Sequence, residues 1–146
     1  MAMNKWDKLY IEFTESVSKL SSAKRLKVGA VIVRDNNIIS YGYNGTPSGF
    51  SNECEHYTCG VNNEAVLVTS NEVIHAEINA VSKAAKQGIS TNNATMYCNV
   101  SPCIECAKLI IQSGINKVIY CKDYRDDAGI KILTKAGIEV VKWQLD

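Results

Sequence analysis

Residues 75–106 read HAEINAVSKAAKQGISTNNATMYCNVSPCIEC and predict a helix, a strand and a second helix in close succession. His75 to Lys86 is rich in Ala and Ile, and Gly88 follows as a glycine typical of helix ends. Ala94 to Val100 is a predicted strand, and Cys103 to Ser113 is a predicted helix that ends at Gly114. Such alternation favours an α/β sheet with helices on both faces.

The alternation continues toward the C-terminus. Lys117 to Cys121 and Ile138 to Trp143 are predicted strands. Between them, Arg125 to Ala136 is a predicted helix that stops at Gly137.

Toward the N-terminus, a β-hairpin is predicted from Lys27–Arg34 and Ile38–Tyr43 around the turn Asp35-Asn36-Asn37. A long loop is expected from Asn44 to about Asn71, where only Ala65 to Val68 is apolar. An amphipathic helix precedes the hairpin, with an apolar face expected from steps of three and four between Trp6, Leu9, Tyr10, Phe13, Val17 and Leu20.

Composition restricts the classes of function. The chain has 146 residues, which fits a single domain over residues 1–146, with 46% hydrophobic and 21% charged residues. Its net charge of +1 argues against duplex nucleic acid or an anionic membrane as partner. We find no apolar run of membrane-spanning length, and Met1 to Asp7 has no apolar signal-peptide core. A cytoplasmic location is expected, in which the six cysteines stay reduced.

Three residues have the chemistry and spacing of metal ligands: His75, Cys103 and Cys106. The two cysteines are three residues apart at a predicted helix start, so both sulfurs fall on one face of its first turn. Pro102 suits the entry to that helix, and the exposed N–H groups there favour thiolates. Three protein ligands with a fourth position left for water are typical of catalytic rather than structural zinc.

Glu77 lies in the first helical turn after His75, where its carboxylate can reach the metal-bound water without binding the metal. A carboxylate there can take a proton from the water and return it to a substrate nitrogen. The alternative interpretation is a buried histidine with two packed core cysteines on unrelated helices. The joint pattern His-x-Glu followed by Pro-Cys-x-x-Cys favours the zinc site, because it matches the signature of zinc deaminases.

The chain resembles the deoxycytidylate deaminases, in the small form found in phages and bacteria. The resemblance covers most of the chain and includes KVGAVIV (27–33), GYNGTPSG (42–49), HAEINA (75–80) and PCIECAK (102–108). It implies a three-layer α/β/α sandwich with a mixed five-stranded sheet of the cytidine deaminase type. The implied reaction is the zinc-dependent hydrolysis of dCMP to dUMP and ammonia for thymidylate synthesis, in which zinc-activated water attacks C4 and Glu77 carries the proton.

The resemblance also implies substrate contacts. Asn44 would bind the sugar 3′-hydroxyl, and the Ala76 N–H and Ser101 carbonyl would read the pyrimidine edge. Tyr124 and Arg125 would hold the 5′-phosphate, with Arg25 in the Lys24–Lys27 basic cluster as a second phosphate contact. From the residues alone, the alternatives are a turn residue at Asn44 and a solvated helix residue at Arg125.

Regulation is implied by the resemblance at Gly42, Tyr43, Asn44 and Gly45, where dCTP would activate and dTTP would inhibit, with Mg²⁺ accompanying the triphosphate. The alternative interpretation of these four residues is the end of an ordinary β-hairpin with no bound regulator. Such regulation acts between two global states of an oligomer, and a homo-hexamer is expected from the same resemblance.

Cys54, His56 and Cys59 offer three further ligands within six residues. Some relatives carry a second, structural zinc in this insertion, and the alternative is a polar loop with solvent-facing thiols. Cys98 and Cys121 lie in apolar strand patterns and are expected in the core.

Two other classes of function are weighed against dCMP deamination. A deaminase acting on a free nucleoside or a tRNA adenosine is disfavoured by Tyr124-Arg125 and by the low net charge. A binding module with structural zinc is disfavoured by the missing fourth ligand and by the carboxylate of Glu77.

Overall fold

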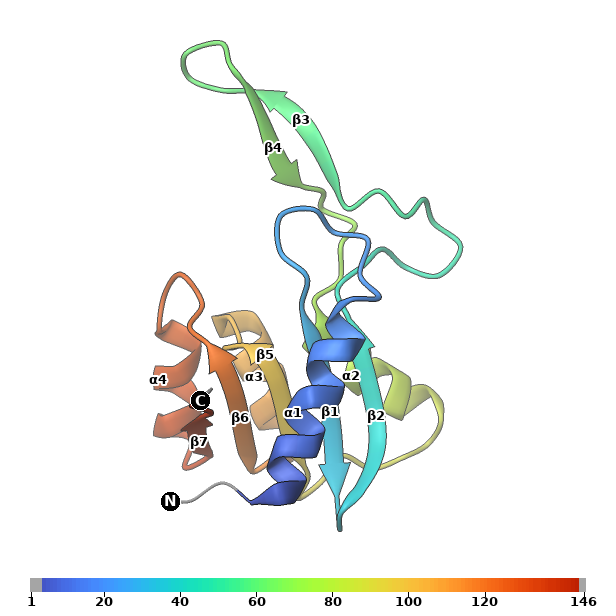
Figure 1. Cartoon of the computed structure of the whole chain (residues 1–146), viewed down its shortest axis with the longest axis vertical. Helices are drawn as coiled ribbons and strands as arrows, with labels where there is room; N and C mark the ends of the chain where they lie inside the picture. The colour runs from blue at the N-terminus through green and yellow to red at the C-terminus, as the bar shows by residue number, and fades with distance from the viewer. Residues whose placement is uncertain (1–3, 145–146) are drawn as a thin grey trace.

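The computed structural model describes residues 4–144, in which one helix is followed by four strands and then by alternating helices and strands (Figure 1). In chain order these are α1 (Lys5–Ser18), β1 (Gly29–Arg34), β2 (Asn37–Tyr43), β3 (Glu55–Cys59), β4 (Ala65–Thr69), α2 (Ala76–Lys86), β5 (Thr95–Val100), α3 (Ile104–Gln112), β6 (Lys117–Lys122), α4 (Ala128–Lys135) and β7 (Glu139–Lys142).

The main sheet has five strands in the order β2-β1-β5-β6-β7. β1 pairs antiparallel with both β2 and β5, whereas β5, β6 and β7 run parallel, which confirms the predicted mixed five-stranded sheet. The β1–β2 turn places Asp35 and Asn36 at positive φ, 51° and 60°, as the predicted tight hairpin requires.

Helices pack on both faces of the main sheet through two separate apolar clusters, which gives three layers. On one face of the sheet, α2, α3 and α4 pack over a core that includes Ile32, Met96, Ile110 and Leu133. On the other face, α1 packs alone through residues such as Tyr10 against strand residues including Tyr97 and Ile119. The α/β/α sandwich is therefore confirmed, with one helix on one side and three on the other.

The parallel strands create the edge at which a site can form. Because β5 and β6 are parallel, their carboxyl ends lie together, as do the segments that follow them. Ser101, Pro102 and Cys103 connect β5 to α3, and the Ser101 N–H donates to the carbonyl of Lys122 at the end of β6 (2.8 Å). Loop residues at this edge are thus held by the sheet itself.

α1 is present as predicted, but its packing face differs from the expected one. Trp6, Leu9, Phe13 and Leu20 are exposed, while Asp7, Thr14 and Ser18 are buried beside Tyr10 and Val17. The buried polar groups have hydrogen-bond partners: the Thr14 hydroxyl donates to the Tyr10 carbonyl within α1 (2.7 Å), and Asp7 accepts from the hydroxyl of Tyr97 on β5 (2.6 Å). Satisfied polar groups can be buried at low cost, so the apolar period alone did not identify the face.

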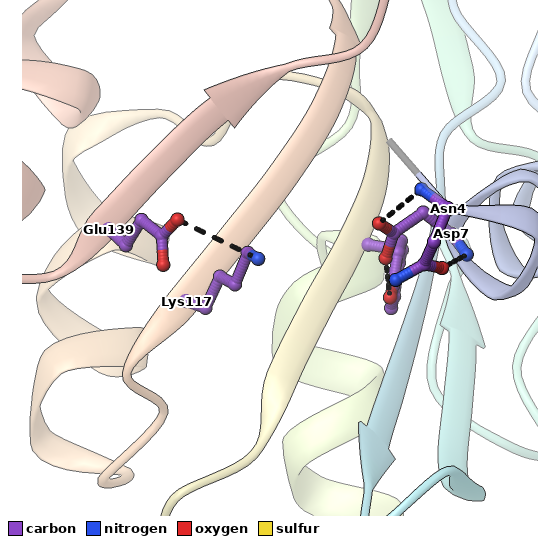
Figure 2. Close-up of polar contacts among 5 residues, drawn as sticks. Asn4, Asp7, Lys117 and Glu139 are labelled. Atoms are coloured by element: carbon purple, nitrogen blue, oxygen red, sulfur yellow. Dashed lines mark hydrogen bonds and ion pairs between the residues drawn. The ribbon is translucent and has the colours of Figure 1, made fainter. Parts of the chain in front are cut away.

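The ends of the sheet and of α1 carry polar contacts that Figure 2 shows. Asn4 caps α1: its Oδ1 accepts from the Asp7 N–H, and the Asp7 carboxylate accepts from the Asn4 N–H in return. The Asn4 Oδ1 also accepts from the Trp6 N–H (2.9 Å). Lys117 pairs with Glu139 (3.7 Å) across β6 and β7. Residues 1–3 of the N-terminal segment Met1–Asp7 lie outside the described residues.

Two other expectations need correction. The segment 44–71, predicted as a loop, contains the β3–β4 hairpin, which Figure 1 shows extending away from the main sheet. The α4 helix begins at Ala128 rather than Arg125, since Tyr124 and Arg125 belong to the loop after β6. Within residues 4–144, no helix combines the length and apolar character needed to cross a bilayer.

Candidate active site

The structure brings His75, Cys103 and Cys106 together at the starts of α2 and α3. His75 and Cys103 are the N-cap residues of the two helices, and Cys106 is buried in the first turn of α3. The His75 Nδ1 lies 3.3 Å from the Cys106 Sγ and 3.5 Å from the Cys103 Sγ. Three ligand atoms therefore converge on one point.

The geometry of this group fits zinc. A tetrahedral ion with ordinary Zn–N and Zn–S bonds separates its nitrogen and sulfur ligands by about 3.6 Å, close to both measured distances. One imidazole and two thiols are also the borderline-soft donors that zinc prefers. With three protein donors, the set leaves a fourth position for water, as in catalytic sites.

Hydrogen bonds among these three side chains shift the pKa values of all three. Hydrogen bonds from Cys106 and His75 hold the pKa of the Cys103 thiol down at about 3. The same hydrogen bond with Cys103, together with burial, raises the pKa of Cys106. The contact with Cys103 also raises the pKa of His75. A bound cation would take the place of these protons.

Glu77 lies buried in the first turn of α2, with 4% of its surface exposed. Burial raises the pKa of its carboxyl to about 7, although a backbone hydrogen bond and the nearby His75 oppose the shift. A carboxylate whose pKa lies near neutral pH can both accept and return a proton. Glu77 is therefore chemically suited to proton transfer beside the metal-ligand group.

A cavity of about 530 Å³ opens at this edge of the sheet. It is lined by most of the sequence-predicted site residues: Arg25, Asn44, His75, Ala76, Glu77, Ser101, Cys103, Tyr124 and Arg125. These residues come from five separate stretches of chain, so only the fold brings them together. Cys106 lies behind the cavity wall, fully buried.

Asn44 is held rigidly at the cavity. Its Oδ1 accepts from the Val28 N–H (2.9 Å), and its Nδ2 donates to the Leu26 carbonyl (2.8 Å). An amide has a second lone pair and a second N–H, so a ligand hydroxyl can still bind. Ala76 is in the first turn of α2, where a backbone N–H has no partner within the helix.

The loop after β6 is tied to the loop after β5. The Ser101 hydroxyl accepts from the Tyr124 N–H (2.7 Å), which fixes where Tyr124 and Arg125 enter the cavity wall. The Arg125 guanidinium carbon lies 5.2 Å from the centre of the Tyr124 ring. Among the described residues, neither Arg125 nor Arg25 has a carboxylate within ion-pair distance. Two such guanidinium groups in one cavity favour an anionic ligand.

Of the residues expected in a regulatory site, Asn44 lines the cavity, whereas Gly42, Tyr43 and Gly45 do not. Gly42 has a packing role, because a Cβ there would lie 2.5 Å from the Ala80 N and 2.6 Å from the Ala76 O of α2. The Tyr43 carbonyl accepts from the Asn79 amide (2.9 Å). This strand end therefore fits tightly against the helix that carries Glu77.

Cys54, His56 and Cys59 do not gather into one cluster. Cys54 is buried near the Ser22 hydroxyl (3.5 Å), and the His56 Nδ1 shares a hydrogen bond with Ser70 (2.8 Å). Cys59 is exposed and donates to Asn63 (3.1 Å). Within residues 4–144, the His75 group is the one set of three ligand-type residues whose donor atoms lie within 4.8 Å of one another.

Sequence reasoning missed four polar residues of the cavity: Glu55, Thr69, Lys122 and Asp123. Glu55 and Thr69 belong to the hairpin that the sequence analysis took as a loop. Asp123 pairs with Lys142 of β7 (2.6 Å). Lys122 and Asp123 directly precede the predicted Tyr124, and their position at the end of a parallel strand was the available signal.

The comparison with known proteins agrees with this geometry. The family model for the cytidine and deoxycytidylate deaminase zinc-binding region matches residues 4–122. This chain belongs to the cytidine and deoxycytidylate deaminase family. The family resemblance predicted from the sequence is thereby confirmed, and zinc binding is a property of the family model itself.

Named relatives narrow the comparison within the family. The deoxycytidylate deaminase of Enterobacteria phage T2 is 39% identical over 160 residues, covering 85% of each chain. That of Saccharomyces cerevisiae is 36% identical over 138 residues, covering 92% of this chain but 44% of the yeast protein. The chain therefore spans less than half of the yeast relative.

A solved structure is similar over nearly the whole length. The dCMP deaminase of cyanophage S-TIM5, crystallised in complex with dCMP and dUMP, superimposes with a TM-score of 0.87 and 38% identity. The match covers 98% of this chain and 100% of the phage chain. The cytidine deaminase-like fold is thus confirmed by a family member.

Proposed function

We propose that this chain hydrolyses dCMP to dUMP and ammonia, and so contributes to pyrimidine deoxynucleotide metabolism and thymidylate supply. The observation that supports this most strongly is the cavity itself. It contains the buried Glu77 beside His75 and Cys103, together with Asn44 and two guanidinium groups that have no carboxylate partner among residues 4–144. These groups match the reacting amine, the sugar and the phosphate of one nucleotide.

His75, Cys103 and Cys106 would hold the metal, and a bound Zn²⁺ would supply an activated water for attack on C4 of the base. The chain's own residues do the rest. The Ala76 N–H and the Ser101 carbonyl orient the pyrimidine edge. Glu77 carries the proton that N3 receives and then the proton that the departing amine receives.

Recognition of the rest of the nucleotide falls to the cavity rim. Asn44 binds the 3′-hydroxyl with the lone pair and N–H that its backbone contacts leave free. Tyr124, Arg125 and Arg25 bind the 5′-phosphate, to which a planar guanidinium group is well suited. This arrangement favours a nucleoside monophosphate over a free nucleoside.

Ammonia release from a set of substrates tests the proposal. The zinc-loaded protein is assayed with dCMP, CMP, deoxycytidine, dCTP and a tRNA containing adenosine at the editing position. We expect dCMP to have the highest kcat/KM. Equal or better turnover of deoxycytidine or of tRNA would contradict the proposed substrate, and no turnover of any of them would contradict deaminase activity.

We further propose that residues 1–146 act as one deaminase domain in a cytoplasmic homo-hexamer, activated by dCTP and inhibited by dTTP, each bound with Mg²⁺. Family resemblance at Gly42, Tyr43, Asn44 and Gly45 supports the regulatory part. The position of Asn44 in the cavity supports it as well, since a regulator held next to this strand end would touch a substrate contact.

A further inference from the structure

One wall of the cavity is built by the base of the β3–β4 hairpin. Glu55 and Thr69 are paired across this hairpin, and both line the cavity. Beyond them, the Ser70 N–H donates to the Cys54 carbonyl (2.8 Å), which closes the hairpin base. The hairpin forms a separate two-stranded sheet and pairs with no strand of the main sheet. Its position at the cavity therefore depends on its contacts with the rest of the chain.

Those contacts reach the segment between α1 and β1. The Glu55 Oε2 accepts hydrogen bonds from two consecutive backbone N–H groups, those of Lys24 (2.8 Å) and Arg25 (2.9 Å). The Ser22 hydroxyl donates to the carbonyl of Asn52, just before the hairpin (2.6 Å). The segment 22–27 has no helix or strand of its own, so these bonds fix its first half, while the Asn44 and Asn99 amides hold its second half by donating to the carbonyls of Leu26 (2.8 Å) and Lys27 (3.0 Å).

Arg25 is held at both ends by the same hairpin. Its backbone N–H is bound by Glu55, and its Nη1 donates to the Thr69 Oγ1 (3.1 Å). The Glu55 carboxylate contacts the backbone and forms no ion pair with the guanidinium group of Arg25. Most of the five donors of Arg25 therefore remain available to a ligand.

We propose that Glu55 is a positioning residue for phosphate recognition: by binding the Lys24 and Arg25 N–H groups, it holds the Arg25 guanidinium at the cavity that Tyr124 and Arg125 also line. The inference rests on the proposed function, since it assigns the phosphate of dCMP to this side of the cavity. It predicts that Glu55 acts on the affinity for phosphate-bearing substrates and leaves the deamination step unaffected.

The test compares Glu55→Ala with Glu64→Ala. Glu64 is a matched control, because its Oε2 accepts from the backbone N–H of Asn62 (2.8 Å) at the far tip of the same hairpin. In Glu55→Ala we expect KM for dCMP to rise about 10- to 100-fold, the range for a lost hydrogen bond to a charged group, with little change in kcat. The kcat/KM for deoxycytidine, which has no phosphate, stays unchanged, and Glu64→Ala behaves as wild type.

Two further variants separate positioning from general structure. Glu55→Gln keeps an oxygen that can accept both N–H groups, so it restores most of the affinity for dCMP. Arg25→Ala raises KM for dCMP by itself, and combining it with Glu55→Ala adds little, because both changes remove the same contact. Zinc content and thermal unfolding are measured for each variant. If Glu55→Ala does not fold, the KM values of the two single variants Arg25→Ala and Glu55→Gln for dCMP are compared instead.

An unchanged KM for dCMP in Glu55→Ala would overturn the inference. So would an equal loss of kcat/KM on dCMP and on deoxycytidine, which would indicate a structural role alone. A wild-type protein that releases no ammonia from dCMP would overturn the proposed function instead. Calorimetric binding of dCMP and deoxycytidine to the same variants would then still test Glu55.

Discussion

At the scale of single residues, the site depends on short spacings that the sequence displays directly. His75 and Glu77 share the first turn of one helix, and Cys103 and Cys106 share that of another. Local geometry therefore already places each pair, which is why the ligand group and the nearby carboxylate were predictable. Glu55 was not, because its partners are about 30 residues away and nothing in its own neighbourhood indicates them.

The metal-ligand group gives the first prediction. Cys103→Ala removes one of three ligands, and the two that remain bind zinc far more weakly, so both bound zinc and activity are lost. Cys59→Ser is the control, since the exposed Cys59 lies outside the group. Metal analysis of the purified proteins is expected to give about one zinc per wild-type chain.

The zinc content of the two variants can contradict the assigned ligands in two ways. Full zinc and activity in Cys103→Ala would contradict the assigned ligands. Two zincs in the wild type, with one lost in Cys59→Ser, would show instead that Cys54, His56 and Cys59 form a second site once metal is present.

At the scale of elements, the regular spacing of apolar residues made the helices and the strands of the main sheet predictable. The two wrong predictions, the β3–β4 hairpin and the start of α4, fall where this spacing gives no signal. β3 is exposed along most of its length and β4 is only half-buried, so neither shows the alternation that identifies a strand packed on a core. α4 begins late because Tyr124 is bound by Ser101, which holds the preceding loop against the sheet. Both errors fall at the cavity, where tertiary contacts outweigh local preference.

Packing between β2 and α2 gives the second prediction. Gly42→Ala would push a methyl group into the backbone of α2 and lower the free energy of unfolding by about 1–3 kcal/mol. Gly45→Ala is the matched control at the same strand end, because its nearest neighbour beyond adjacent residues is a Tyr43 ring carbon at 4.0 Å. Urea unfolding of zinc-loaded protein measures both, and equal stability of the two variants would contradict this packing role.

At the scale of the whole molecule, α1 carries exposed apolar side chains on its outer side. Trp6, Leu9 and Phe13 are exposed on α1, Leu20 is exposed just beyond its end, and Phe13 packs edge-on against Tyr41 of β2 (6.2 Å between ring centres). Clustered exposed side chains of this kind mark interaction surfaces. Their step of three and four predicted the helix correctly but could not show that this side faces outward.

The proposed hexamer gives the third prediction. Light scattering should report about six times the 16.1 kDa chain mass, and replacing Leu9 and Phe13 by Ser should reduce that mass. A monomeric mass would contradict the proposed assembly.

The proposed regulation gives a separate prediction. With Mg²⁺ present, dTTP is expected to lower the rate at subsaturating dCMP, and dCTP is expected to restore it. Unchanged saturation curves would contradict the regulation while leaving the catalytic proposal in place.

Glu77 is proposed to carry the proton in dCMP deamination, and the Glu77→Gln variant tests this role. The amide keeps the shape of the side chain, while His75, Cys103 and Cys106 are untouched, so zinc content should equal that of the wild type. Ammonia release from dCMP, measured beside the wild type, should fall in kcat by about 10²–10⁴-fold or more with KM little changed. Near-normal turnover by the zinc-loaded variant would contradict the mechanism, and loss of zinc would show that Glu77 is a ligand.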